Sequence, residues 1–110
     1  MGVDDEYVAS ELARARLYTI VYLRPGPRYD DPDDGGLIYA HVKRNFELKL
    51  AGDVAVVGPT RSVGEVCGLY LFNCDAERAT ELIATDPAVE AGFFTFEVQA
   101  MMAFPGDTLA

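Results

Sequence analysis

The sequence is poor in three residue types on which much protein chemistry depends. Its 110 residues include one histidine, two cysteines and no tryptophan. Histidine is the side chain that ordinarily changes charge near neutral pH, so chemistry of that kind has to pass through His41. Cys67 and Cys74 are an odd number of residues apart, so in one strand they would point to opposite faces and could not form a disulfide. Because two cysteines and one histidine match no zinc-binding spacing, we expect free thiols and no metal site.

Basic residues and long apolar runs are also scarce. Nine lysines and arginines stand against 18 aspartates and glutamates, a formal charge of −9. Such a field repels phosphate backbones and anionic membranes, so neither nucleic acid nor a membrane is an expected partner. No stretch approaches the roughly 18 apolar residues of a transmembrane helix, and the acidic start MGVDDEYVAS does not resemble a signal peptide. We therefore expect a soluble, cytoplasmic protein.

The composition and length are those of one small globular domain. Half of the residues are apolar and a quarter are charged, which is enough to bury a core without disulfides or metal. We expect the domain to span residues 17–104. Residues 1–16 form an N-terminal extension with a weak helical pattern, and residues 105–110 form a tail.

Hydrophobic patterns predict six regular elements in this domain. In order, they are a strand at 17–23, a helix at 37–50, strands at 54–59 and 66–72, a helix that begins after Asp75, and a strand at 93–104. The segment 24–36 is rich in proline, glycine and aspartate, and is predicted to be a long loop. The second helix should end before Asp86-Pro87, because the residue before a proline disfavours the helical region. The AVEAG segment that follows is expected to be a loop.

The helix at 37–50 has the clearest pattern. Ile38, Val42, Phe46 and Leu50 recur in steps of four, which is typical of an amphipathic helix. Asp34 and Gly52 are predicted to cap its start and end.

The element order predicts an α+β fold, the ferredoxin-like βαββαβ arrangement with a four-stranded antiparallel sheet. Both helices would cover one face of that sheet. The other face would present apolar and aromatic side chains to water, which is typical of an interface. We therefore expect a homodimer or a higher oligomer.

This topology brings several polar features to one end of the domain. They are the 24–36 loop, His41 near the start of the first helix, the Gly58-Pro59 turn, and Asp86 at the end of the second helix. A carboxylate bonded to one imidazole nitrogen would orient the ring and leave the other nitrogen as a general base. The alternative is a histidine on the helix surface and an aspartate that only ends a helix.

Other side chains are weaker candidates for binding. Arg24 and Arg28 border the predicted pocket and could clamp a carboxylate or phenolate, or could pair with neighbouring acids. Tyr18 could present its hydroxyl to the pocket, or could pack in the core or a dimer interface. Pro32 stands where a DxDxDG loop needs a calcium ligand, so a solvated loop is expected there.

The order of these motifs resembles the YCII-related (YciI-like) family. The residues that carry the resemblance are His41, Gly58-Pro59, a helix begun by Asp75, and the run DPAVEAG at 86–92, and the similarity covers residues 17–104. It implies a dimeric α+β barrel with His41 and Asp86 as the active pair and no cofactor. The short connection between the second and third strands and the RPGPRYD loop depart from the family pattern, which leaves the pocket and substrate open.

The resemblance also suggests a reaction class. Characterised members include a chlorohydroxyhydroquinone dehydrochlorinase, and the fold is similar to that of muconolactone isomerases. We expect a lyase or isomerase that moves a proton on a small cyclic or aromatic-derived substrate, with Gly58 and Pro59 beside it. The alternative is a non-catalytic dimeric module that binds a small molecule or a protein.

Overall fold

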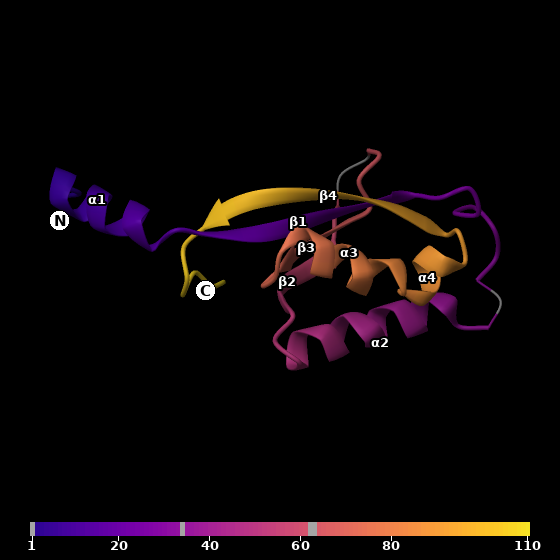
Figure 1. Ribbon diagram of the computed structural model, residues 1–110. Coiled ribbons are helices and arrows are strands. Elements are labelled where there is room, and N and C mark those ends of the chain that lie inside the picture. The colour runs from indigo at the N-terminus through magenta and orange to yellow at the C-terminus, as the bar shows by residue number, and fades with distance from the viewer. Residues whose placement is uncertain (1, 34, 62–63) are drawn as a thin grey trace.

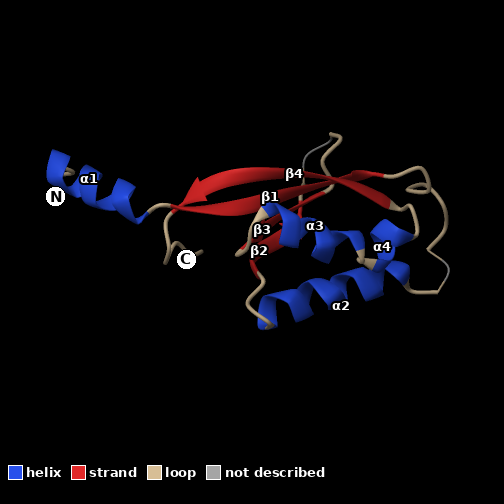
Figure 2. Cartoon of the chain, viewed as in Figure 1, coloured by secondary structure: helices blue, strands red, loops and turns tan. Residues whose placement is uncertain are grey.

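The computed structural model describes residues 2–33, 35–61 and 64–110. Its elements follow in the order α1 (Asp5–Arg14), β1 (Arg16–Pro25), α2 (Leu37–Leu50), β2 (Val54–Pro59), β3 (Gly68–Phe72), α3 (Ala76–Ala84), α4 (Pro87–Glu90) and β4 (Phe94–Ala103) (Figures 1 and 2). The strands form an antiparallel sheet in the order β2-β3-β1-β4. The predicted α+β class with a four-stranded antiparallel sheet is confirmed, and the arrangement is compatible with a ferredoxin-like fold.

The hydrophobic core lies between the sheet and three helices. Helices α2, α3 and α4 lie on the same face of the sheet (Figure 1). Strand β1 directs Thr19, Val21 and Leu23 toward these helices, and all three are buried. The alternate residues of β1 and β3, among them Ile20 and Leu71, are half-buried on the opposite face, because successive strand residues point to opposite sides.

Helix α2 has the predicted bounds, and both of its ends are capped. The carboxylate of Asp33 accepts hydrogen bonds from the backbone N–H groups of Leu37 (2.7 Å) and Ile38 (3.2 Å). The predicted cap, Asp34, lies outside the described residues. At the other end Gly52 adopts φ +83°, and its N–H donates to the carbonyl of Lys49. This left-handed position favours glycine and ends the helix as predicted.

The segment after α3 is helical, so the prediction of a loop there was wrong. Pro87–Glu90 forms α4, and Asp86 is its N-cap. Proline suits the first position of a helix, because its missing N–H would have no partner there and its φ is already helical. The same Asp-Pro pair that ends α3 therefore begins the next helix.

Most of the apolar residues that recur in steps of four along α2 lie outside its buried face. Phe46 is 57% exposed and Leu50 is 91% exposed, whereas His41 and Leu48 are buried. The step-of-four pattern predicted an amphipathic helix, but the most deeply buried residues, His41 and Leu48, do not belong to that stripe. Helix α2 therefore has a second, outward apolar face.

The molecule is elongated because two strands extend past the others. Pairing between β1 and β3 reaches only Thr19, whereas pairing between β1 and β4 continues to Arg16 and Ala103. Helix α1 follows from this two-stranded ribbon and projects away from the domain (Figure 1). The radius of gyration is 16.3 Å, against about 13 Å expected for a compact chain of this length. In the described residues, no helix is both long and apolar enough to cross a membrane.

Candidate functional site

His41 and Asp86 form a buried pair where α2 meets the start of α4. Nδ1 of His41 lies 2.9 Å from each carboxylate oxygen of Asp86. Asp86 is fully buried, and His41 is 7% exposed. The two residues are 45 positions apart in the sequence, and the fold brings them together because His41 lies on the inward side of α2.

The carboxylate of Asp86 is held by backbone groups as well as by the imidazole. Its Oδ2 accepts hydrogen bonds from the N–H groups of Ala88 (3.0 Å) and Val89 (3.2 Å). These contacts follow from its N-cap position in α4. An ionised carboxylate can only accept, so toward ionised Asp86 the donor is Nδ1 of His41; in that tautomer of the neutral imidazole, Nε2 has a free electron pair.

Two further polar side chains extend this pair into a chain of hydrogen bonds. The amide nitrogen of Asn45 lies 3.3 Å from Nε2 of His41, and the amide oxygen of Asn45 accepts from the hydroxyl of Tyr70 at 2.6 Å. Burial, together with the nearby Asp86 carboxylate, raises the pKa of Tyr70. The phenol therefore stays protonated and donates, so that the chain of donors runs from Tyr70 through Asn45 and His41 to Asp86.

A cavity of about 340 Å³ lies against the His41 side of this chain. Helix α2 contributes Ile38, Val42 and Phe46 to its walls, and β2 and β3 contribute the opposite wall. The ring of Phe94 packs 5.1 Å from the imidazole, measured between ring centres. The walls are mainly apolar, and His41, Asn45 and Tyr70 are their main polar groups. Such a lining suits a small, largely apolar ligand.

The structure brings some of the predicted site residues together. Gly58 and Pro59 line the same cavity as His41, and Asp86 lies directly behind the imidazole. The sequence interpretation missed Asn45 and did not connect Tyr70 to the pair. The signal for Asn45 was its position one helical turn after His41, which places both side chains on neighbouring parts of one helix face.

The predicted binding residues Arg24, Arg28 and Tyr18 do not line this cavity. Arg24 forms ion pairs with Glu97 (3.0 Å) and Glu65 (3.2 Å). Arg28 pairs with Asp31 at 2.9 Å and borders a separate hollow beside the 24–36 segment. The backbone of Tyr18 pairs with Met101, in the ribbon that leads toward α1. Both arginines thus form ion pairs with acidic residues, which was the alternative to binding a ligand.

The cysteines are separate and free. Cys67 borders the cavity, and both thiols are half-buried. Burial raises the pKa of the Cys74 thiol, so this group is less reactive than an exposed cysteine. Within residues 2–33, 35–61 and 64–110, no three histidine, cysteine, aspartate or glutamate side chains are grouped so that they could hold a metal ion.

Comparison with known proteins does not assign a family to this chain. No protein family model matches the chain, and no curated protein matches its sequence.

Proposed function

We propose that this protein is a small, cofactor-independent enzyme in which His41 acts as a general base on a small cyclic or aromatic-derived substrate. The observation that carries the proposal is an oriented His41–Asp86 pair on the wall of an apolar cavity. The reaction is an elimination or an isomerisation that begins with removal of a proton from the substrate. The resemblance to YCII-related proteins points to the same class.

The chemistry follows from the hydrogen bonds of the imidazole. Asp86 holds the tautomer in which Nε2 is the basic nitrogen, and it stabilises the imidazolium that forms when Nε2 takes a proton. A positioned general base contributes about 10² to 10⁴ in rate. The contact between Nε2 and Asn45, at 3.3 Å, is long for a hydrogen bond. A substrate that offers a better donor can therefore displace it.

The cavity also limits the substrate. Its volume of about 340 Å³ lies at the small end of ligand sites. No arginine or lysine borders it among the described residues. A neutral lactone or a phenol with one ring suits these walls better than a multiply charged acid, because an anion buried there would lack a paired cation.

A homodimer is the second part of this proposal. The open face of the sheet carries half-buried apolar side chains from the inner strands, among them Ile20, Leu69 and Leu71. Two copies that pack these faces together would form a dimeric α+β barrel and remove this surface from water. Sedimentation at micromolar concentration should show a dimer, and a monomer would contradict this part.

The test of the catalytic proposal uses proton exchange, which needs no knowledge of the product. The protein is incubated in D₂O with a panel of one-ring lactones and phenols, and loss of each C–H signal is followed by NMR. The wild-type protein should accelerate exchange at one carbon of at least one compound. His41→Gln should abolish this exchange, and Asp86→Asn should lower it by about 10²-fold or more.

The alternative function is a module that binds the same ligands without turnover. The nearly complete burial of His41 and its contact with Asn45 favour this reading. If a compound shifts the His41 resonances and its affinity survives His41→Gln, but wild-type protein catalyses no exchange, the protein is a binding module. If no compound shifts those resonances, the cavity is not a ligand site and both functions fail.

A further inference from the structure

Helix α1 has the properties of a segment that packs against another molecule. None of its residues is buried, and Leu12 is 63% exposed. It has 10 residues, whereas an isolated helix of fewer than about 12 to 15 residues is only marginally stable in water. A helix of this length that contacts so little of its own chain gains most of its stability from tertiary packing on its apolar side.

The apolar side of α1 is narrow and is flanked by acids. Val8 and Leu12 are one turn apart and lie on the same face. Helical periodicity places Asp5 on one side of this pair and Glu11 on the other. With the N-cap Asp4 and Glu6, the helix carries four carboxylates against Arg14. We call the face made by Asp5, Val8, Glu11 and Leu12 the arm face.

The outward side of α2 has the complementary pattern. Its four apolar residues form one continuous exposed stripe, which consists of Tyr39, Val42, Phe46 and Leu50. Helical periodicity places Lys43 on one border of this stripe and Lys49 on the other, and these are the two lysines of the whole chain. We call these six residues the outer face of α2. It lies away from buried Leu48, and its Val42–Phe46 edge reaches the cavity that His41 also lines.

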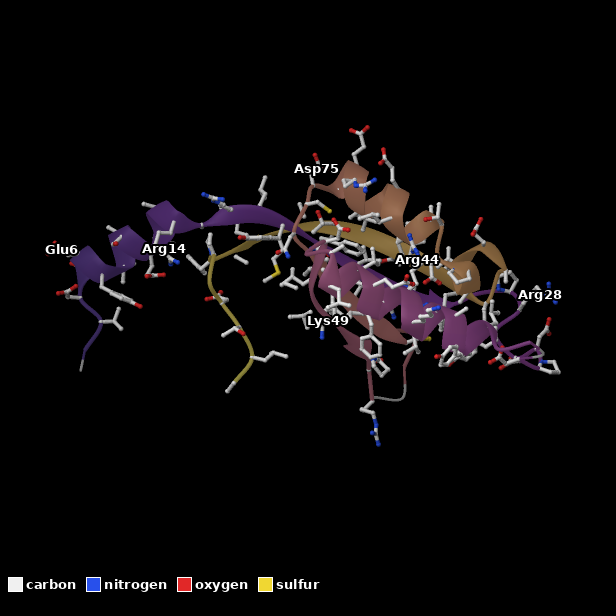
Figure 3. The ribbon with its side chains drawn as sticks, turned by 90° about the horizontal axis from the view of Figure 1, so that it is seen from below. Glu6, Arg14, Arg28, Arg44, Lys49 and Asp75 are labelled. Atoms are coloured by element: carbon white, nitrogen blue, oxygen red, sulfur yellow. The ribbon has the colours of Figure 1, made fainter. Side chains whose placement is uncertain are left out.

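The two faces of one chain do not meet each other. Helix α1 projects from the ribbon along the long axis of the molecule, and α2 lies under the sheet (Figure 1). In the perpendicular view, Glu6 and Arg14 on α1 are well separated from Arg44 and Lys49 on α2 (Figure 3). A contact between the faces therefore requires either a second molecule or a large movement of α1.

From these observations we propose that the arm face of one molecule docks on the outer face of α2 in a second copy of this chain. Apolar residues meet apolar residues, and the acids that flank one stripe meet the lysines that flank the other. A twofold arrangement makes the contact twice, because each copy supplies both faces. The second copy thus covers two apolar surfaces that are both exposed in a single molecule.

The contact would also affect the cavity. Val42 and Phe46 belong both to the outer face of α2 and to the cavity wall. The partner's α1 would lie over this wall and shield it from water. The cavity would then be complete only in the assembled protein.

Charge reversal tests the pairing of the two faces. Asp5→Lys/Glu11→Lys makes both faces of one variant positive, and Lys43→Glu/Lys49→Glu makes both faces of the other variant negative. Each variant alone should associate about tenfold or more weakly than wild type in sedimentation. A mixture of the two should recover association, since both contacts are then complementary. If neither reversal weakens association, or if the mixture does not recover it, the proposal is wrong.

A cross-link tests the contact itself, independently of any dimer through the open sheet face. A Leu12→Cys chain and a mass-tagged Phe46→Cys chain are mixed under mild oxidation, and the disulfide is mapped by mass spectrometry. A link between positions 12 and 46 of different chains is expected. Ser10→Cys, on the opposite side of α1, is the matched control and should link much less. Equal linking from positions 10 and 12, or no 12–46 link, would overturn the proposal. In Leu12→Cys/Phe46→Cys, a link made only within one chain would overturn it too. Neither experiment depends on catalysis.

Discussion

The two ends of this molecule differ in which side chains they bury and which they expose. At the α4 end, Asp86 and His41 are buried, and each has hydrogen-bond partners. At the α1 end, apolar side chains such as Leu12 and Leu17 face water. The buried His41–Asp86 pair therefore has its hydrogen-bond partners within one chain, while apolar side chains at the other end are left exposed.

This difference separates the properties that a single molecule can have from those that require a second copy. The polar chain of Tyr70, Asn45, His41 and Asp86 is complete within one domain, so its geometry does not depend on assembly. The apolar stripes of α1 and α2, in contrast, are exposed to water in a single copy. We expect substitutions at the first region to change folding and chemistry, and substitutions at the second to change association.

The largest effect is expected at Asp86. Asp86→Ala removes a buried acceptor from two backbone N–H groups and from His41, so it should lower the free energy of unfolding by about 3 to 5 kcal/mol. Asp75→Ala is the matched control, because Asp75 also caps a helix but is exposed; its cost should be about 1 kcal/mol. Urea denaturation measures both. Equal losses would mean that Asp86 acts only as a cap.

The next largest effect should separate the two sides of α2. Leu48 is 6% exposed and Leu50 is 91% exposed on the same helix. Leu48→Ala should cost about 2 to 4 kcal/mol, whereas Leu50→Ala should cost less than about 0.5 kcal/mol in dilute protein. If the cost at Leu50 rises with protein concentration, the increase measures the contact with a second copy. Similar costs in dilute protein would show that the outer face of α2 packs within the chain.

A smaller effect, with a characteristic pH dependence, is expected at Tyr70. Near pH 7, Tyr70→Phe removes the donor to Asn45 and should cost about 1 to 2 kcal/mol. Tyr22→Phe, on the open face of the sheet, should change stability by less than about 0.5 kcal/mol.

The raised pKa of Tyr70 sets the sign of the pH effect. The folded state binds this proton more tightly than the unfolded state, whose tyrosines ionise near the ordinary pKa of 10.0. The contribution of Tyr70 is therefore fully present below about pH 10 and is lost as the pH rises further. The difference in stability between wild type and Tyr70→Phe should narrow above pH 10. A constant difference through pH 11 would show that the proton is held no more tightly in the folded state.

Much of the fold could be predicted because local patterns agreed with the tertiary structure. The strand predicted at 93–104 is present as β4, in which Phe94, Phe96 and Val98 are half-buried and alternate with exposed residues. Asp75 and Gly52 predicted helix boundaries through capping that depends only on neighbouring residues. Strand β1 continues two residues beyond the predicted end, to Pro25, because β4 pairs with it there. Pairing of that kind cannot be read from one segment.

The site was only partly predictable for a similar reason. His41 and Asp86 were expected at the same end of the fold from topology, and the structure brings them into contact. The outward direction of the stripe that includes Phe46 could not be predicted, since periodicity identifies an apolar face but not what covers it. The placement of Arg24 depends on Glu65 and Glu97, which are distant in the sequence.

The two apolar faces of α2 have a consequence for how this sequence can change. Leu48 packs in the core, His41 lies in the candidate site, and Phe46 belongs to the outer face. Three sides of one helix therefore each restrict which residues can be substituted. Most helices in a small domain have a solvent side on which substitutions accumulate freely. In α2 the outer face takes up much of that side and would be covered by the proposed contact, so a saturation library should tolerate variation at Glu47, outside this face, far better than at Phe46.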